Sequence, residues 1–151
     1  MLDTTISIAY LNQLNSGNYT ANLGIEFTEM TDSTLTARMP VDQRTIQPFG
    51  IVHGGANAGL GESVGSVAAY LSVDREQYYT VGQEIKCNHL KPASSGYVYG
   101  TASALRLGRQ THLWQIAIRD AEASLTAFCT LTMMVLPLTE EMRQIQQQYF
   151  F

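Results

Sequence analysis

Residues 47–66 read QPFGIVHGGANAGLGESVGS, and this stretch carries most of the evidence for the fold. A helical pattern starts near Gly54 and continues to about Ser72, because apolar residues recur there at the helical period. The residues on this apolar face are Leu60, Val64, Val67, Ala68 and Leu71. The pattern predicts one long helix whose apolar stripe packs on a core.

A second face of the predicted helix carries a single carboxylate, Glu62, among small residues. Its other members are Ala58, Gly59, Gly65, Ser66 and Ala69. Glycine inside a helix costs roughly 1 kcal/mol relative to alanine. The interior glycines therefore need a tertiary reason, such as the close approach of a sheet, a second helix or a ligand. Burial on such a face should raise the pKa of Glu62, which suits a base or a nucleophile.

Strand patterns lie on both sides of this helix. A short helix over residues 8–14 precedes a predicted hairpin, in which the alternating runs 23–27 and 35–39 flank turn residues 31–33. Four long strands are expected after the helix, at about Tyr78–His89, Tyr97–Leu107, Gln110–Asp120 and Ser124–Leu136. Their short connections require antiparallel neighbours.

The whole chain is therefore predicted to be one α+β domain over residues 1–151, in which an antiparallel sheet wraps one long helix. Residues 137–151 are expected to form a C-terminal helical extension. Thr139 suits its N-cap, and Glu140 and Glu141 suit the positive end of its helix dipole.

Composition limits the class of protein. Hydrophobic residues make up 45% and charged residues 15% of the chain, as in a globular protein. The net charge of −4 argues against a broad nucleic-acid surface, and no apolar run approaches the roughly 20 residues that span a bilayer. The N-terminus lacks the features of a secretion signal.

The spacing of Cys87 and Cys129 indicates neither a disulfide framework nor a zinc ribbon, and two thiols favour a reducing, cytoplasmic setting.

Four of the nine basic residues gather between positions 86 and 109. They are Lys86, Lys91, Arg106 and Arg109. Solvated strand ends would explain them, and so would a local phosphate site on an otherwise acidic protein.

The motifs of this chain resemble those of the hotdog-fold thioesterases, in the branch with phenylacetyl-CoA and 4-hydroxybenzoyl-CoA thioesterases. The resemblance is nearest to the bacterial 1,4-dihydroxy-2-naphthoyl-CoA thioesterases and extends over roughly residues 6–136. It rests on the segments Met39–Asp42, His53–Gly55, Glu62–Ala68, Asn88–His89, Leu107–Gly108 and Trp114–Ile116. It implies the hotdog fold and hydrolysis of an acyl-CoA thioester, with coenzyme A as part of the substrate and with no cofactor or metal.

The resemblance also implies roles for individual residues. Glu62 would act as base or nucleophile, while the Gly54 N–H and the Gln47 side chain would polarise the thioester carbonyl. His53 would help to shape this donor site. Ser66 lies one turn beyond Glu62 on the same helix face, and from this position we expect it to hold the attacking water. The chemistry agrees, because N–H groups at a helix start are unpaired and lie at its positive end.

Contacts with coenzyme A are implied at three places, which include part of the basic cluster. These residues are Gly82; His89, Leu90, Lys91 and Pro92; and Arg106, Leu107, Gly108, Arg109, Gln110 and Thr111. The acyl group stays open between an aromatic one, which the resemblance favours, and a medium-chain aliphatic one. The acyl pocket is expected among Phe49, Ile51, Leu60, Val64 and the strand 83–87.

Helix geometry separates the two halves of this site. Gly54 and Glu62 are eight residues apart, which is ~12 Å at 1.5 Å per residue, yet both must reach one thioester carbon. We therefore expect a homodimer with composite active sites, in which Gln47, His53 and Gly54 of one subunit face Glu62 and Ser66 of the other. A dimer of dimers is the expected assembly.

Three rival interpretations stand beside this one. Residues 61–65 match the G-x-S-x-G nucleophile elbow, but they lie inside a predicted helix and not after a strand. His53, His89 and His112 match no compact metal motif. A non-catalytic acyl-CoA-binding module is the third, since a fold does not fix a function.

Asn57 is expected to serve local capping or helix packing.

Overall fold

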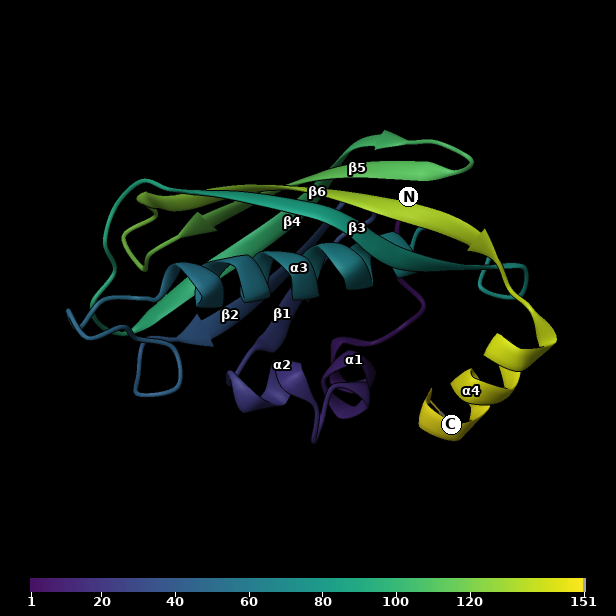
Figure 1. Ribbon diagram of the computed structural model, residues 1–151, viewed down its shortest axis with the longest axis horizontal. Coiled ribbons are helices and arrows are strands. Elements are labelled where there is room, and N and C mark those ends of the chain that lie inside the picture. Colours follow the sequence, from purple (N-terminus) through teal and green to yellow (C-terminus); the bar gives the residue numbers. More distant parts are fainter. Residues whose placement is uncertain (151) are drawn as a thin grey trace.

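The computed structural model describes the backbone of residues 1–150 and side chains up to residue 147 (Figure 1). Its elements follow in the order α1 (Ile8–Leu14), α2 (Tyr19–Asn22), β1 (Glu26–Met30), β2 (Thr34–Pro40), α3 (Gly54–Tyr70), β3 (Tyr78–His89), β4 (Tyr97–Leu107), β5 (Thr111–Arg119), β6 (Leu125–Pro137) and α4 (Glu140–Phe150). The prediction of a short helix, a hairpin, a long helix, four strands and a C-terminal helix is confirmed. The helix α2 is an addition.

The strands form one antiparallel sheet in the order β1-β2-β4-β5-β6-β3. The predicted meander is β4-β5-β6, and β3 lies beyond β6 at the far side. β1 and β3 are therefore the two edges of the sheet. Asn12 of α1 bonds both backbone groups of Phe27, with distances of 2.8 and 3.0 Å, and so attaches α1 to β1.

The long helix α3 crosses the concave face of the curved sheet (Figure 1). Leu60, Val64 and Ala68 are fully buried in the core, and burial of each Leu or Val contributes about 1.5–3 kcal/mol. A Cβ at Gly65 would lie only 2.5 Å from Leu131 Cδ2 of β6. The tertiary reason expected for a glycine is thus found at this position, because a side chain would push the helix off the sheet.

The first strand starts later than the sequence pattern indicates. Asn18 caps the short helix α2, since its Oδ1 accepts from the N–H groups of Thr20 and Ala21. The helix that starts at this cap ends with Leu23 as its C-cap, so Leu23 is not part of the strand and β1 begins at Glu26. The long helix likewise ends at Tyr70, two residues before the expected end.

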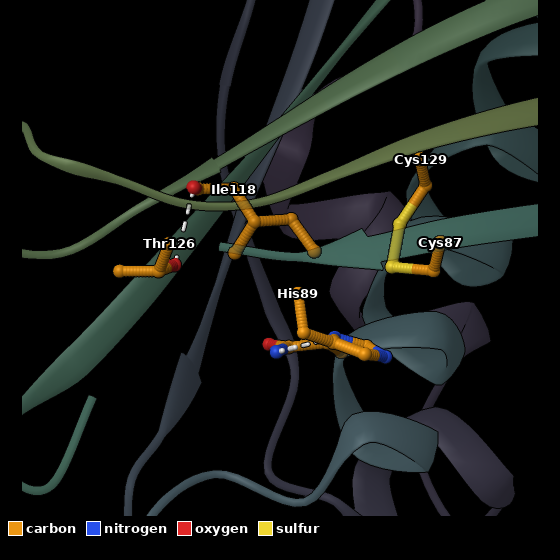
Figure 2. Close-up of a disulfide and its surroundings, with 6 residues drawn as sticks. Cys87, His89, Ile118, Thr126 and Cys129 are labelled. Carbon is orange, nitrogen blue, oxygen red and sulfur yellow. Dashed lines mark hydrogen bonds between the residues drawn. A yellow bond between two sulfur atoms is a disulfide. The ribbon is translucent and has the colours of Figure 1, made fainter. Parts of the chain in front are cut away.

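The two cysteines are register partners on β3 and β6, and a disulfide joins Cys87 to Cys129 (Figure 2). The prediction that they form no disulfide is wrong. Their separation of 42 residues says nothing about strand register, which depends on the return of β3 beside β6. The argument from free thiols to a reducing compartment loses its basis.

The helix α4 occupies the predicted C-terminal extension. The Thr139 hydroxyl accepts from the Met142 N–H at 3.2 Å, and two glutamates, Glu140 and Glu141, stand in the first turn. Arg143 donates to the backbone carbonyl of Glu76, at 3.0 Å, and so ties α4 to the connection before β3. Within residues 1–150, no helix is long and apolar enough to cross a membrane.

Candidate active site

The loop before α3 places Gln47 beside the start of that helix. The Gln47 N–H donates to the Ile51 carbonyl at 2.8 Å, and the Gly50 N–H donates back to the Gln47 carbonyl at 2.9 Å. Gly50 has a φ of 73°, which favours glycine and closes this tight turn. The buried Thr45 accepts from the His53 N–H through its carbonyl, at 2.8 Å, and fixes the other end of the loop.

His53 is the N-cap of α3. Its Nδ1 accepts a hydrogen bond from the Gly55 N–H at 2.8 Å. A neutral imidazole whose Nδ1 accepts must carry its proton on Nε2. The side chain is exposed, so this Nε2–H is available to a ligand.

A cleft of about 480 Å³ opens at this helix start. Its lining includes Gln47, Ile51, Val52, Gly54, Asn57, His89, Leu90, Lys91, Pro92, Ala93 and Thr126. The structure thus brings together the carbonyl-polarising candidates and one of the three predicted coenzyme A segments, residues 89–92. Ile51 of the expected acyl pocket also lines it.

His89 lies directly over the first residue of α3. A Cβ at Gly54 would be 2.8 Å from His89 Nε2, which is closer than side chains approach one another. Any side chain at this position would therefore require the imidazole or the helix start to move. Asn57, one turn into α3, points its Nδ2 at His89 Nδ1 over 3.5 Å.

Glu62 lies further along α3, against the edge strand β3. It is half-buried, and its Oε1 accepts a hydrogen bond from Ser66 Oγ at 3.2 Å. A side chain at Gly82 of β3 would overlap the same carboxylate oxygen. Burial raises the pKa of Glu62 above its usual value, and the Ser66 hydrogen bond lowers it in part. This agrees with the direction expected from the sequence.

The strand register places the two halves of the site at opposite ends of the sheet. Gly82 pairs with Met133, which pairs with His112, which pairs with Leu107. The row through His89 crosses Ala127, Ile118 and Gly100. Seven strand residues, roughly 20 Å, separate the two rows.

One chain therefore does not assemble the predicted site. Glu62, Ser66, Gly82 and the segment 106–111 lie at one end. The cleft lined by Gln47, Gly54 and 89–92 lies at the other, with His53 next to Gly54 in the chain.

The basic cluster is divided in the same way. Lys91 pairs with Asp120 at 3.0 Å, at the end of β5 that lies away from the β4–β5 turn. Arg106 and Arg109 are exposed at that turn, and Lys86 is exposed on β3. These residues are close in sequence, but the hairpin formed by β4 and β5 places Lys91 at one end of the sheet and Arg106 and Arg109 at the other.

Several sequence expectations need correction. Leu60 and Val64 cannot line an acyl pocket in this chain, because they are fully buried in the core. Of the two roles expected for Asn57, capping is excluded because His53 caps the helix, whereas helix packing agrees with its burial, at 6% exposure; its side chain faces His89. The feature of the sequence that could have indicated a functional role for Asn57 is a polar amide one turn inside a helix of mostly small and apolar residues.

Two of the rival interpretations conflict with the geometry. Ser63 lies inside α3, and a loop precedes the helix, so no nucleophile elbow forms. His112 Nδ1 lies 3.4 Å from Ser72 Oγ, at the opposite end of the sheet from His89. The three histidines do not converge.

Comparison with known proteins gives a consistent set of relatives. Residues 49–127 match the family model of the thioesterase superfamily. An esterase of Pseudomonas aeruginosa is 48% identical over 131 residues, covering 85% of this chain and 90% of that protein. The 1,4-dihydroxy-2-naphthoyl-CoA hydrolase of Escherichia coli is 45% identical over 131 residues, covering 87% and 96%. The crystal structure of a thioesterase from Haemophilus influenzae superposes with a TM-score of 0.89 at 41% identity, covering 92% and 96%.

Proposed function

The chain belongs to the thioesterase superfamily and has its hotdog fold, and from this premise we propose how it hydrolyses an acyl-CoA thioester. The observation that carries the proposal is the pairing of two features on one helix. α3 begins at an open Gly-Gly turn beside a cleft, and it bears a half-buried carboxylate two turns later. The N–H groups of the open helix start suit binding of the thioester carbonyl oxygen, and the carboxylate suits the attack on the thioester carbon.

The helix start acts on the thioester carbonyl. The Gly54 N–H, at the positive end of α3, and the Gln47 side chain donate to the oxygen as negative charge develops on it. Loss of one such donor typically costs 10²–10³ in kcat. His53, held by the Gly55 N–H, presents its Nε2–H at the same mouth.

Glu62 acts on the carbonyl carbon. It either removes a proton from water as the water oxygen attacks, or attacks itself to form an anhydride that water then hydrolyses. In both routes the C–S bond breaks, coenzyme A leaves as a thiolate that takes up a proton, and the acyl group leaves as a carboxylic acid. Burial favours this role because it strips water from the carboxylate.

The working site is shared between two subunits of a homodimer. Within one chain, roughly 20 Å separates the row of Gly82 from the row of His89. A two-fold axis near the middle of β3, between Ile85 and Lys86, superposes the Gly82 end of one subunit on the His89 end of the other. Glu62 then faces the partner's Gly54, twice per dimer.

The edges of the sheet support this arrangement. Exposed edge strands invite pairing with another chain unless they are covered. α1 is attached to β1 through Asn12, whereas no strand pairs with the outer edge of β3 in the described part of the chain. The 12-residue β3 is long enough to pair with its own copy.

The same axis reunites the divided basic cluster. Lys91 of one subunit comes to the end of the sheet that carries the partner's Arg106 and Arg109, and together they would meet the phosphates of coenzyme A. Two such dimers would pack through the outer sheet face, where Val81, Leu113 and Met134 are exposed.

The substrate is proposed to carry an aromatic acyl group. The relative from Escherichia coli is named for a dihydroxynaphthoyl thioester and is similar over almost its whole length. A medium-chain aliphatic acyl group is the alternative. A panel of aromatic and aliphatic acyl-CoA thioesters, with free thiol detected, separates the two by kcat/KM.

Complementation between two inactive variants tests the composite site. Glu62→Gln removes one half of the site and Gln47→Ala the other. If both are co-expressed, half of the dimers are mixed and each mixed dimer keeps one complete site, so about one quarter of the wild-type activity returns. No gain over the single variants would refute the shared site. Undiminished thiol release by Glu62→Gln alone would refute its catalytic role, and no release by the wild type would favour a binding module.

A further inference from the structure

Asn57 combines burial with incomplete hydrogen bonding. It lies in the second turn of α3, is 6% exposed and lines the cleft. Its Nδ2 points to His89 Nδ1 over 3.5 Å, and among the described residues no donor reaches its Oδ1. A buried carbonyl oxygen without a partner costs about 1–3 kcal/mol. Stability alone does not explain an amide here, because an apolar side chain of similar size would avoid this cost.

The amide does explain the state of His89. When Asn57 Nδ2 donates to His89 Nδ1, the neutral imidazole must carry its proton on Nε2. That Nε2 is the atom that lies against Gly54, at the place where α3 begins. Its N–H therefore points into the cleft that also holds the Gly54 N–H and Gln47.

We propose that Asn57 is a positioning residue that holds His89 as the Nε2–H tautomer, so that His89 donates to the thioester oxygen beside Gly54. The catalytic part of this inference rests on the proposed function, whereas the tautomer does not. The ring comes from β3 and the amide from α3, so the pair also fixes the strand against the helix start. His89 is on the side of β3 that faces α3, two residues beyond Cys87 (Figure 2).

Two substitutions of nearly equal size separate positioning from packing. Asn57→Asp replaces the donor by a carboxylate, which accepts and so favours the Nδ1–H tautomer. Asn57→Leu removes the partner and leaves His89 free to populate both tautomers. Asn57→Leu should not lower the melting temperature, since the unpaired Oδ1 disappears with the amide.

The chain has three histidines, so NMR of protein labelled with ¹⁵N-histidine resolves each ring. The wild type is expected to show His89 protonated on Nε2, Asn57→Asp on Nδ1, and Asn57→Leu as a mixture. His53 and His112, which have partners of their own, serve as internal controls and should not change. A wild-type His89 protonated on Nδ1 would overturn the proposal, whatever the enzyme's activity.

Kinetics test the catalytic part. Asn57→Asp is expected to lower kcat roughly 10- to 100-fold with a smaller change in KM, as for the loss of a positioned donor. The kcat of Asn57→Leu should lie between those of Asn57→Asp and the wild type, because the fraction of His89 in the Nε2–H tautomer should also be intermediate. If the tautomer changes and kcat does not, His89 is no donor to the reacting oxygen, even though Glu62→Gln still identifies the enzyme as a thioesterase.

Discussion

Gly54→Ala should separate the chemistry of the helix start from its stability. A methyl group there would lie 2.8 Å from His89 Nε2, where non-bonded heavy atoms normally stand about 3.5 Å apart. The imidazole must therefore move by about 0.7 Å, or the helix start must move instead.

The size of the effect follows from this displacement. A misplacement of about 1 Å at a reacting centre costs on the order of 100-fold in rate. A shift of about 0.7 Å is therefore expected to lower kcat/KM roughly 10- to 100-fold, which corresponds to about 1.4–2.7 kcal/mol of transition-state stabilisation. Unfolding should not become easier, because alanine is the better helix former by up to about 1 kcal/mol.

The assay is steady-state release of free thiol from the best acyl-CoA of the panel, with thermal unfolding measured in the same buffer. Ser63→Ala is the matched control, since Ser63 lies on α3 but outside the proposed machinery. Its activity should stay near the wild-type value, which would also exclude a serine nucleophile. A Gly54→Ala enzyme that folds normally and keeps kcat/KM within twofold of the wild type would refute the proposed role of the helix start.

Three further predictions concern the carboxylate. Because burial raises the pKa of Glu62, its ionised form opposes folding at neutral pH; Glu62→Gln should therefore be more stable than the wild type at pH 7, and equilibrium unfolding should show this difference shrinking as the pH falls through the raised pKa of the folded state and vanishing below 4.5. Ser66→Ala removes the hydrogen bond that lowers this pKa, so the acidic limb of the kcat/KM profile should move to higher pH; an unmoved limb would contradict the assignment. Gly82→Ala places a methyl group on Glu62 Oε1 and should reduce kcat far more than the melting temperature, as a pair of melting and rate measurements would reveal.

Local patterns were sufficient to predict most of the fold. The apolar stripe of Leu60, Val64 and Ala68 predicts α3, and turn residues 31–33 predict the first hairpin. The pairing of β3 with β6 could not be predicted from local patterns, because β4 and β5 lie between these two strands in the sequence. The disulfide was missed for this reason, since register and not spacing brings Cys87 to Cys129.

The candidate site shows the same division between local and long-range information. The motif at His53–Gly54 and the lone acid Glu62 could be found from residue types and helix geometry. The contact of His89 with Gly54 could not, because it depends on where β3 ends relative to the start of α3. The role of Asn57 could not be predicted for the same reason: its partner lies 32 residues away on another element.

The glycines of α3 connect the stability of the helix with the position of its carboxylate. Gly61 and Gly65 lie close to Cys129 and Leu131 of β6, so the helix sits nearer to the sheet than side chains at these positions would allow. Each costs roughly 1 kcal/mol in helix propensity. Because the helix lies this close to the sheet, Glu62, which stands between the two glycines in sequence, reaches Gly82 on the edge strand. The carboxylate is half-buried there and remains beside the open edge of the sheet. A helix that stood further from the sheet would leave this acid in water with an ordinary pKa and out of reach of the second subunit that is proposed to pair with β3.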